Sequence, residues 1–489
     1  MCISAANKAL LLIAAWALAG CTVGPDFERP AAPQVKSYAG GGDPARTAEA
    51  VGGRQQFLAA NVPADWWRLF ESSEMNDAVR RGLEGSPTIA LAQASLKQAR
   101  DELASGEASL YPQIAIGAGV SRQQPSANGN PSRLQPGAYN LFSLTGAITY
   151  LLDIFGGQRR SIEALGAQVD YAENADRAAA LGLAATIADT LIASAAYRAE
   201  IAATTTIIQQ EESQVRLAHV LVTAGTENYA AELSLQGQLE TARASLPVLQ
   251  QQLARSEHLL AVLQGQLPAE GRASQIDLDR LILPPEIPLS VPSLLVRHRP
   301  DILQAEASLH AASAEIGVAT AAMLPSVTLD GTIGYSSLSG SNLFAPQSNL
   351  WGLAANISQP VFNGGMLWYR RQAARDAFLG AQAQYRQTVL TAFQQVADAL
   401  RALEHDAATL AANEAALQSA RKAARLVEAN YGAGLASYSA VLLADAQLRQ
   451  AQIAEIQSRA QRYQDTVALF VSLGGGWWSG QLLEKASER

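Results

Sequence analysis

The side chains that most often carry out chemistry are few in this chain, and their spacing matches no reactive site. Its five histidines do not stand at metal-ligand spacing from one another, from a cysteine or from a carboxylate. They are His219, His258, His298, His310 and His405. The glycine run 474–476 lacks the Lys-Ser/Thr that completes a phosphate-binding loop. Aspartates and glutamates recur at helical spacing, as on a solvated helix face. The sequence therefore predicts no enzyme, no metal site and no cofactor.

One residue, Cys21, does predict a chemical modification. Lys8 precedes the apolar run 9–19, and small residues lead into the cysteine in Leu18-Ala19-Gly20-Cys21. A basic start, a short apolar core and small residues before a cleavage point are typical of a secretory signal. Because the segment ends on cysteine, it resembles a bacterial lipobox, in which the cysteine becomes the lipidated first residue. We expect residues 1–20 to be removed and Cys21 to be acylated; the alternative is a plain signal peptide with a chance cysteine.

Composition narrows the remaining possibilities. The formal net charge is −8, and an acidic chain is a poor partner for nucleic acid. Alanine-rich, aromatic-poor composition favours long helices. The only cysteines are Cys2 and Cys21, so the mature chain has no internal disulfide. We find no apolar run of about 18 residues after the signal and expect no transmembrane helix, so that any membrane span must be made of strands.

The elements of the chain occur twice in the same order. The segment "PTIALAQASL" at 87–96 matches "PDILQAEASL" at 300–309. Each copy predicts a helix, a pair of strands, a very long helix and a return helix. We expect an extended N-terminal arm at 21–64, a first repeat at 65–298 that ends in a proline-rich linker at 267–296, and a second repeat with a C-terminal tail at 299–489.

The two strand pairs alternate apolar and polar residues. They are expected at about 112–122, 140–152, 326–336 and 350–362. Polar loops rich in proline, glycine, asparagine and serine separate the strands of each pair, as in a hairpin with a long tip. Strands of this length cross a bilayer when tilted. A soluble sheet with one buried face is the alternative that alternation alone leaves open.

Each hairpin leads into long helices, expected at about 158–265 and 366–473, with turns at Gly225 and Gly434. Pro247 should kink or interrupt the first return helix. In the second long helix, apolar residues step by four and three, which predicts a coiled-coil seam. The seam consists of Val389, Phe393, Val396, Leu400, Leu403, Ala407 and Leu410.

With these motifs the sequence resembles the TolC-like outer membrane factors, in particular their lipoprotein branch (NodT/OprM-like). The matching segments are Cys21 with its lipobox, "WWRLF" at 66–70, "YLLDIFGGQRR" at 150–160, "RHRPDILQAEASL" at 297–309 and "LGGGWW" at 473–478. The resemblance implies a mainly α-helical protein with a transmembrane β-barrel. It also implies a homotrimer with twelve strands in the barrel, a helical periplasmic tunnel and an equatorial belt.

The implied function is that of an exit duct in the bacterial outer membrane, anchored by lipid. Such ducts serve an inner-membrane pump, here expected to be of the resistance-nodulation-division type, through a periplasmic adaptor. Four strands from one chain cannot close a barrel, whereas three chains supply twelve strands and leave a lumen. Two alternatives are an exit duct for a secreted polypeptide and, in another class, a periplasmic coiled-coil scaffold.

The tips and the gate are the candidate functional sites. The tip residues expected to contact the adaptor are Gly225, Thr226, Asn228, Tyr229, Gly434, Ser437 and Tyr438. Family members commonly close the tunnel just beyond the second tip with a carboxylate, but the corresponding position here is Leu443. The nearest acid is Asp445, which points about 200° away around a helix and is expected to pair with Arg449. We therefore expect Leu443 to form a mainly apolar gate.

Overall fold

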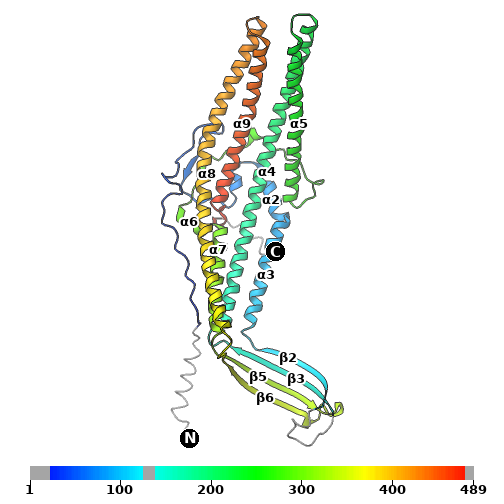
Figure 1. Cartoon of the computed structure of the whole chain (residues 1–489), viewed down its shortest axis with the longest axis vertical. Coiled ribbons are helices and arrows are strands. Elements are labelled where there is room, and N and C mark those ends of the chain that lie inside the picture. The colour runs from blue at the N-terminus through cyan, green and yellow to red at the C-terminus, as the bar shows by residue number, and fades with distance from the viewer. Residues whose placement is uncertain (1–21, 125–137, 480–489) are drawn as a thin grey trace. The chain divides into compact units, whose positions relative to one another are not determined.

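The computed structural model describes residues 22–124 and 138–479 (Figure 1). Cys21 and the signal segment lie outside the described residues. The chain divides into two compact units. The first comprises Met1–Pro30, Leu96–Ala172 and Ala305–Tyr385, and the second comprises Ala31–Ser95, Glu173–Gln304 and Arg386–Arg489. The first contains the large sheet and the second contains the helix tips.

The helices confirm the internal duplication through their lengths. Helices α3 (Pro87–Ala108) and α7 (Pro300–Ala321) each have 22 residues and begin with proline, which is tolerated in the first turn because its missing N–H has no partner there. Helices α4 (Gly157–Thr223) and α8 (Met366–Gly432) each have 67 residues. The return helices α5 (Tyr229–Leu263) and α9 (Tyr438–Ser472) each have 35. These three pairs of helices therefore match in length between the two copies.

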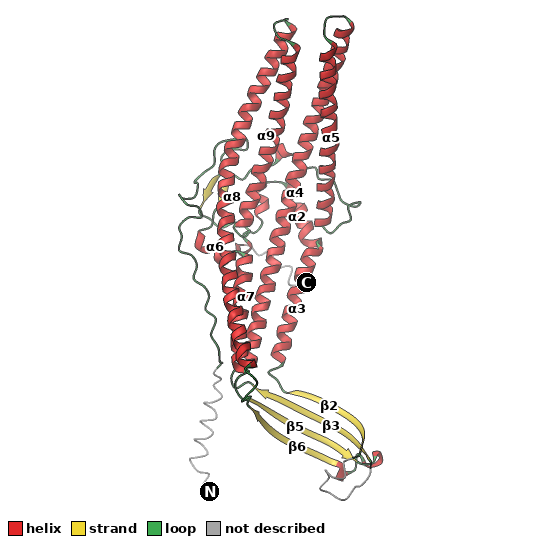
Figure 2. Ribbon diagram, viewed as in Figure 1, coloured by secondary structure: helices red, strands yellow, loops and turns green. Residues whose placement is uncertain are grey.

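Four strands form one antiparallel sheet in the order β2-β3-β5-β6 (Figure 2). They are β2 (Gln113–Gln123), β3 (Tyr139–Leu152), β5 (Ser326–Ser337) and β6 (Asn349–Ser358). The central pairing, β3 with β5, joins the two repeats. The outer edges of β2 and β6 have no strand partner among the described residues. The predicted strands are confirmed, except that β6 ends at Ser358 rather than 362, just before Pro360, which lacks the N–H of a ladder bond.

The two faces of the sheet differ in chemistry. The register places most of the isoleucine, valine, leucine and aromatic residues of neighbouring strands on one face, for example Ile148 beside Ile114 and Trp351 beside Ile333. Many of these side chains are exposed; they include Ile114, Ile116, Val120, Ile333, Trp351, Leu353 and Ile357. The opposite face carries mostly glycine, alanine, serine and threonine. An exposed apolar face of this kind is typical of a surface that meets another protein or a membrane.

Two helices bear on the expectations from the sequence. Helix α5 is continuous through Pro247 and is not interrupted there. Helix α4 is long and apolar enough to resemble a membrane span, because alanine, leucine and isoleucine dominate residues 178–197. Such a helix was not predicted from the sequence. However, 56% of its most apolar window is buried inside the protein. Such burial is typical of a core helix.

The core of the second unit contains the predicted coiled-coil seam. Of its seven residues all but Phe393 are buried, and Phe393 is half-buried against Tyr38 of the N-terminal arm. The arm is not merely extended, because its short strand β1 (Gln56–Leu58) pairs in parallel with β4 (Glu286–Pro288) of the linker. Two shorter helices are α2 (Ser73–Gly85) and α6 (Pro292–His298). The short 3-10 helices are η1 (Trp66–Phe70), η2 (Leu278–Arg280), η3 (Gly340–Asn342), η4 (Pro346–Ser348) and η5 (Trp477–Ser479).

Candidate functional site: the helix tips and the clamp beside them

The two tips reverse the chain by the same backbone device. Gly225 and Gly434 have φ of 72° and 74°, the left-handed conformation that ends a helix at glycine. The amide of Thr226 donates to the Leu221 carbonyl at 2.9 Å, and the amide of Leu435 donates to the Asn430 carbonyl at 2.8 Å. These bonds satisfy carbonyls that a helix end leaves free. The predicted turns are thus confirmed as turns.

The first tip is capped and exposed. Asn228 is the N-cap of α5, and its side-chain oxygen accepts from the Ala230 amide at 2.9 Å. Tyr229 follows it and is 60% exposed. At the second tip, Ser437 occupies the N-cap but makes no side-chain capping bond; its hydroxyl lies 2.8 Å from that of Ser439.

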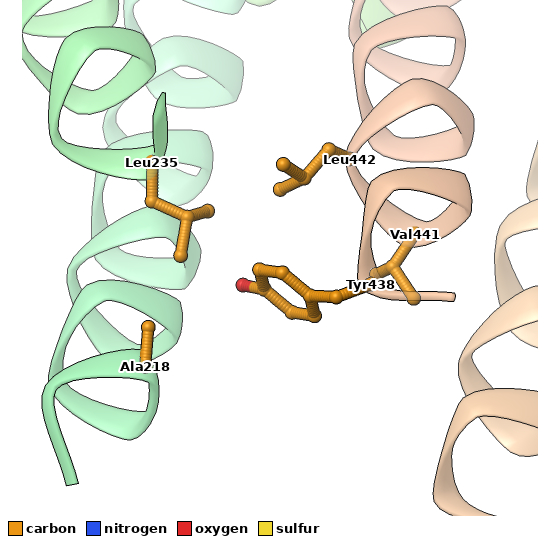
Figure 3. Close-up of a cluster of buried hydrophobic side chains, with 5 residues drawn as sticks. All are labelled: Ala218, Leu235, Tyr438, Val441 and Leu442. Atoms are coloured by element: carbon orange, nitrogen blue, oxygen red, sulfur yellow. The ribbon is translucent and has the colours of Figure 1, made fainter. Parts of the chain in front are cut away.

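The second tip differs from the first because Tyr438 is buried, with 9% exposed. It lies in an apolar cluster with Val441 and Leu442 of α9, Leu235 of α5 and Ala218 of α4 (Figure 3). Its ring also contacts Tyr431, 5.1 Å away between centroids. The side chain of this tyrosine therefore joins the second helix pair to the first, whereas its counterpart Tyr229 faces solvent.

Two polar contacts continue this connection along α9. Asp445 accepts a hydrogen bond from the Gln214 side chain of α4 at 2.5 Å. Arg449 forms an ion pair with Glu211 of α4, whose side chain is 2% exposed. The expected pairing of Asp445 with Arg449 is wrong. Arg449 pairs with Glu211 instead, because a buried carboxylate requires a positively charged partner more than an accessible one does. We call the apolar cluster and these two contacts the inter-pair clamp.

Electrostatics in the clamp follow from its burial. Burial raises the pKa of Glu211, while the charge and hydrogen bond of Arg449 oppose that shift and Asp445 adds to it. Burial also raises the pKa of Tyr438, whose hydroxyl has no hydrogen-bond partner within the described part of the chain. Leu443 lies on the other side of α9 and is 62% exposed. The predicted gate residue is therefore free to face another molecule.

The residues that follow Cys21 are anchored in the first unit. The Val23 amide donates to the Phe155 carbonyl at 3.1 Å, where β3 has ended and α4 is about to begin. Arg160 is 4% exposed, and its guanidinium donates to the Val23 carbonyl at 3.2 Å and to Asp26 at 2.6 Å. The chain just after the predicted acylation site is thus fixed beside the end of the sheet.

The segments "RHRPDI" and "LGGGWW" meet in the second unit. Arg299 is 7% exposed, and its guanidinium donates to the Ser472 carbonyl of α9 at 2.9 Å and to the Asp301 carboxylate at 2.8 Å. The Trp477 indole donates to the His298 carbonyl at 2.7 Å, and Trp478 stacks on the His298 ring. These motifs therefore bind the end of α9 to the start of α7. Their role is structural.

Sequence reasoning missed a group of half-buried acids in the second unit. Burial raises the pKa of Asp189 in α4 to about 7, and the charge of Asp465 adds to the shift. Burial is also the main cause that raises the pKa of Asp406 in α8 to about 7. The hydrogen bond and the charge interaction with Asp465 of α9 raise this pKa further. The nearby Arg462 is 1% exposed, and its guanidinium bonds to residues of the arm. No spacing in the sequence marks these acids, since they come from three helices.

Comparison with known proteins identifies the family. The model of the outer membrane efflux protein family matches residues 78–266 and 291–475. The chain belongs to this family. It is 29% identical over 488 residues to the toluene efflux pump outer membrane protein TtgC of Pseudomonas putida, covering 98% of this chain and 99% of that protein. It is 30% identical over 479 residues to the outer membrane protein OprJ of Pseudomonas aeruginosa, covering 96% of each.

The fold agrees with solved outer membrane channels. The structure of the outer-membrane channel OprN superposes with a TM-score of 0.84 at 26% identity, covering 94% of this chain and all of that one. The expected TolC-like fold is confirmed at this level. As a member of the efflux family, the protein lies in the outer membrane with a large periplasmic portion and works with adaptor and inner-membrane pump partners. Among the described residues, no group of histidine, cysteine and carboxylate side chains could hold a metal ion.

Proposed function

We propose that three copies of the chain form a trimer whose sheets close a twelve-stranded barrel, continued into the periplasm by a tunnel of the long helices. Substrates handed over by a pump and its adaptor leave the cell passively through this duct. The observation that supports the proposal is the sheet itself, which has an exposed apolar face and two edges without a strand partner in the described part of the chain. Ile116 and Leu353 are each 82% exposed on that face, and burying such a side chain is worth about 1.5–3 kcal/mol.

The geometry of the edges favours closure with further copies. Three antiparallel pairings separate β2 from β6, so the two edge strands run in opposite directions. The β6 edge of one copy can therefore pair antiparallel with the β2 edge of the next, in a head-to-tail ring. Two copies would give eight strands with a filled interior, and three give twelve with an open lumen. The polar face, with its small side chains, then lines water.

Cys21 supplies the proposed lipid anchor. Val23 and Arg160 hold the following residues beside the end of the sheet, which would place an acyl chain next to the barrel. Thr22, rather than aspartate, follows the cysteine and suits transfer to the outer membrane. Cys21→Ser should abolish palmitate labelling of the mature protein, and persistent label would refute the anchor.

The tips are the proposed adaptor contacts. Gly225, Thr226, Asn228 and Tyr229 present an exposed first tip, and Gly434 and Ser437 present the second with Tyr438 packed beneath it. Tryptophan at Thr226 or Ser437 should weaken cross-linking of the trimer to its adaptor and leave the trimer intact. Unchanged cross-linking would show that the adaptor binds elsewhere.

The gate is proposed to be apolar. Leu443 from three chains would narrow the tunnel beyond the second tip by excluding water. Asp445 is already engaged by Gln214 within its own chain. Leu443→Ser should raise single-channel conductance in a planar bilayer, while Asp445→Asn should change it little. The reverse result would assign the gate to Asp445.

One experiment tests the function as a whole. Full-length protein from outer membranes should run in SDS as an oligomer of about three 51.6 kDa chains until it is boiled, and it should conduct ions in a planar bilayer. A monomer that does not conduct would favour a periplasmic scaffold instead. Affinity capture then distinguishes the two duct functions: recovery of a resistance-nodulation-division pump supports efflux, and recovery of a polypeptide exporter supports protein secretion.

A further inference from the structure

The polar face of the sheet contains one charged side chain among the described residues of its four strands. This is Asp330 of β5, which pairs directly with Thr149 of β3. The other charged strand residue, Arg122, lies on the apolar face, in register with Asn140. Around Asp330 the polar face consists mostly of glycine, alanine, serine and threonine. A single charge therefore stands in an otherwise neutral surface.

The carboxylate of Asp330 is held in place from both sides. Its Oδ1 accepts a hydrogen bond from the Thr149 hydroxyl at 3.0 Å, and its Oδ2 accepts one from the Asn356 amide at 2.8 Å. The donors come from the two strands that flank β5, so the charge is fixed over the middle strands of the sheet. Both donors are neutral, and none of the ion pairs among the described residues involves Asp330. The negative charge is thus hydrogen-bonded but not neutralised.

We propose that Asp330 sets the ion selectivity of the barrel, as a ring of three carboxylates that favours cations over anions. This inference rests on the proposed trimer, in which the polar face lines the lumen. Threefold symmetry then places one Asp330 from each chain at the same height. The substrate class favoured at this point is a cationic or neutral small molecule, and anions are slowed.

The size of the effect depends on the salt concentration. Twelve strands about 4.8 Å apart and tilted by about 40° give a backbone radius of roughly 12 Å, so each carboxylate would lie about 9 Å from the axis. With the dielectric constant of water and Debye screening, three such charges enrich a monovalent cation over an anion on the axis about sixfold at 0.1 M. The same calculation gives about thirtyfold at 0.01 M and almost no enrichment at 1 M.

The test is the reversal potential of single trimers in a planar bilayer under a KCl gradient of about 0.1 to 0.01 M, the range in which screening is weak. Asp330→Asn keeps a side chain of the same shape that can still accept from Thr149, and it should lower the potassium-to-chloride permeability ratio several-fold. Conductance in 1 M KCl should stay unchanged. Thr332→Asn is the matched control, because it alters the next position on the same face without changing charge. Adding Thr332→Asp to Asp330→Asn should restore selectivity.

Three results would overturn the inference. The permeability ratio could be equal in the wild type and in Asp330→Asn, it could fall equally in Thr332→Asn, or it could fail to recover when the charge is moved to position 332. The pair Asp330→Glu and Asp330→Gln repeats the comparison at equal side-chain length, and it decides the matter if the asparagine variant does not assemble. Absence of any conducting channel in the wild type would instead refute the proposed function itself.

Discussion

Replacing Asp189 with asparagine should remove part of the dependence of stability on pH between pH 5 and pH 8. This carboxyl lies in α4, and burial together with the charge of Asp465 raises its pKa from the ordinary 3.8 to about 7. A carboxyl with a raised pKa binds its proton more tightly in the folded state than in the unfolded state. The contribution of Asp189 to the free energy of unfolding is therefore most favourable below pH 4, and stability falls as the pH rises towards 7. Above pH 7 both states are ionised and the loss is complete.

The magnitude follows from the two pKa values. Between pH 5 and pH 8 the linkage amounts to about 2.5 kcal/mol per chain. For a chain of 489 residues the unfolding entropy is on the order of 1 kcal/mol/K, so the melting temperature should shift by about 2–3 °C. Relative to Asp189→Asn, the melting temperature of the wild type should fall by about 2–3 °C between pH 5 and pH 8.

The assay is thermal unfolding of the purified trimer, followed by tryptophan fluorescence at one scan rate and several pH values. Asp398→Asn in α8 is the matched control, because Asp398 is an exposed aspartate on a long helix. Its melting curve should follow the wild type at every pH. A difference between wild type and Asp189→Asn that stays constant from pH 5 to pH 8 would refute the reasoning.

Further predictions concern the inter-pair clamp and the junction of α7 with α9. Arg449→Met leaves the buried Glu211 without its partner and should destabilise the chain by about 3–5 kcal/mol. Adding Glu211→Leu should restore most of the lost stability. If calorimetry showed that the two substitutions destabilise the chain additively, that result would contradict a buried pair. Tyr438→Ala should cost about 3–5 kcal/mol and speed hydrogen exchange at both tips, while Tyr229→Ala at the exposed equivalent position should change stability by less than about 0.5 kcal/mol. Arg299→Met should accelerate amide hydrogen exchange at the end of α9 by at least about tenfold, because it removes charge-assisted bonds to Ser472 and Asp301 worth about 1.5–3 kcal/mol. Unchanged hydrogen exchange would argue against the junction of α7 with α9.

Local signals in the sequence were enough to predict the repeated elements. Alternation of apolar and polar residues predicted all four strands of the large sheet, and β6 alone ended early, at Ser358. The turns at Gly225 and Gly434 were predictable because a helix that ends on glycine needs a left-handed residue there. These features depend on residues close together in the chain. Their physical causes can be read directly from the sequence.

Features that join distant segments could not be predicted in the same way. Strand β1 pairs with β4 across more than 200 residues, and a three-residue strand has no periodicity to detect. The repeat predicted equivalent roles for Tyr229 and Tyr438, yet within one chain Tyr438 packs against the other helix pair while Tyr229 is exposed. The pairing of Arg449 with Glu211 rather than with Asp445 depends on which carboxylate is buried. Burial is a property of the folded chain and not of local spacing.

The equal lengths of the duplicated helices restrict how such a protein can evolve. One residue inserted into a helix advances everything beyond it by about 1.5 Å and turns it by about 100°. An insertion in α4 would thus move Glu211 and Gln214 out of line with Arg449 and Asp445 of α9 unless α5, α8 and α9 lengthened by the same amount. Lengthening by seven residues restores nearly the same rotation, since two turns take about 7.2 residues. The lengths of α4, α5, α8 and α9 should therefore change among descendants in whole heptads and together, so that these long helices can be extended only through coordinated mutations.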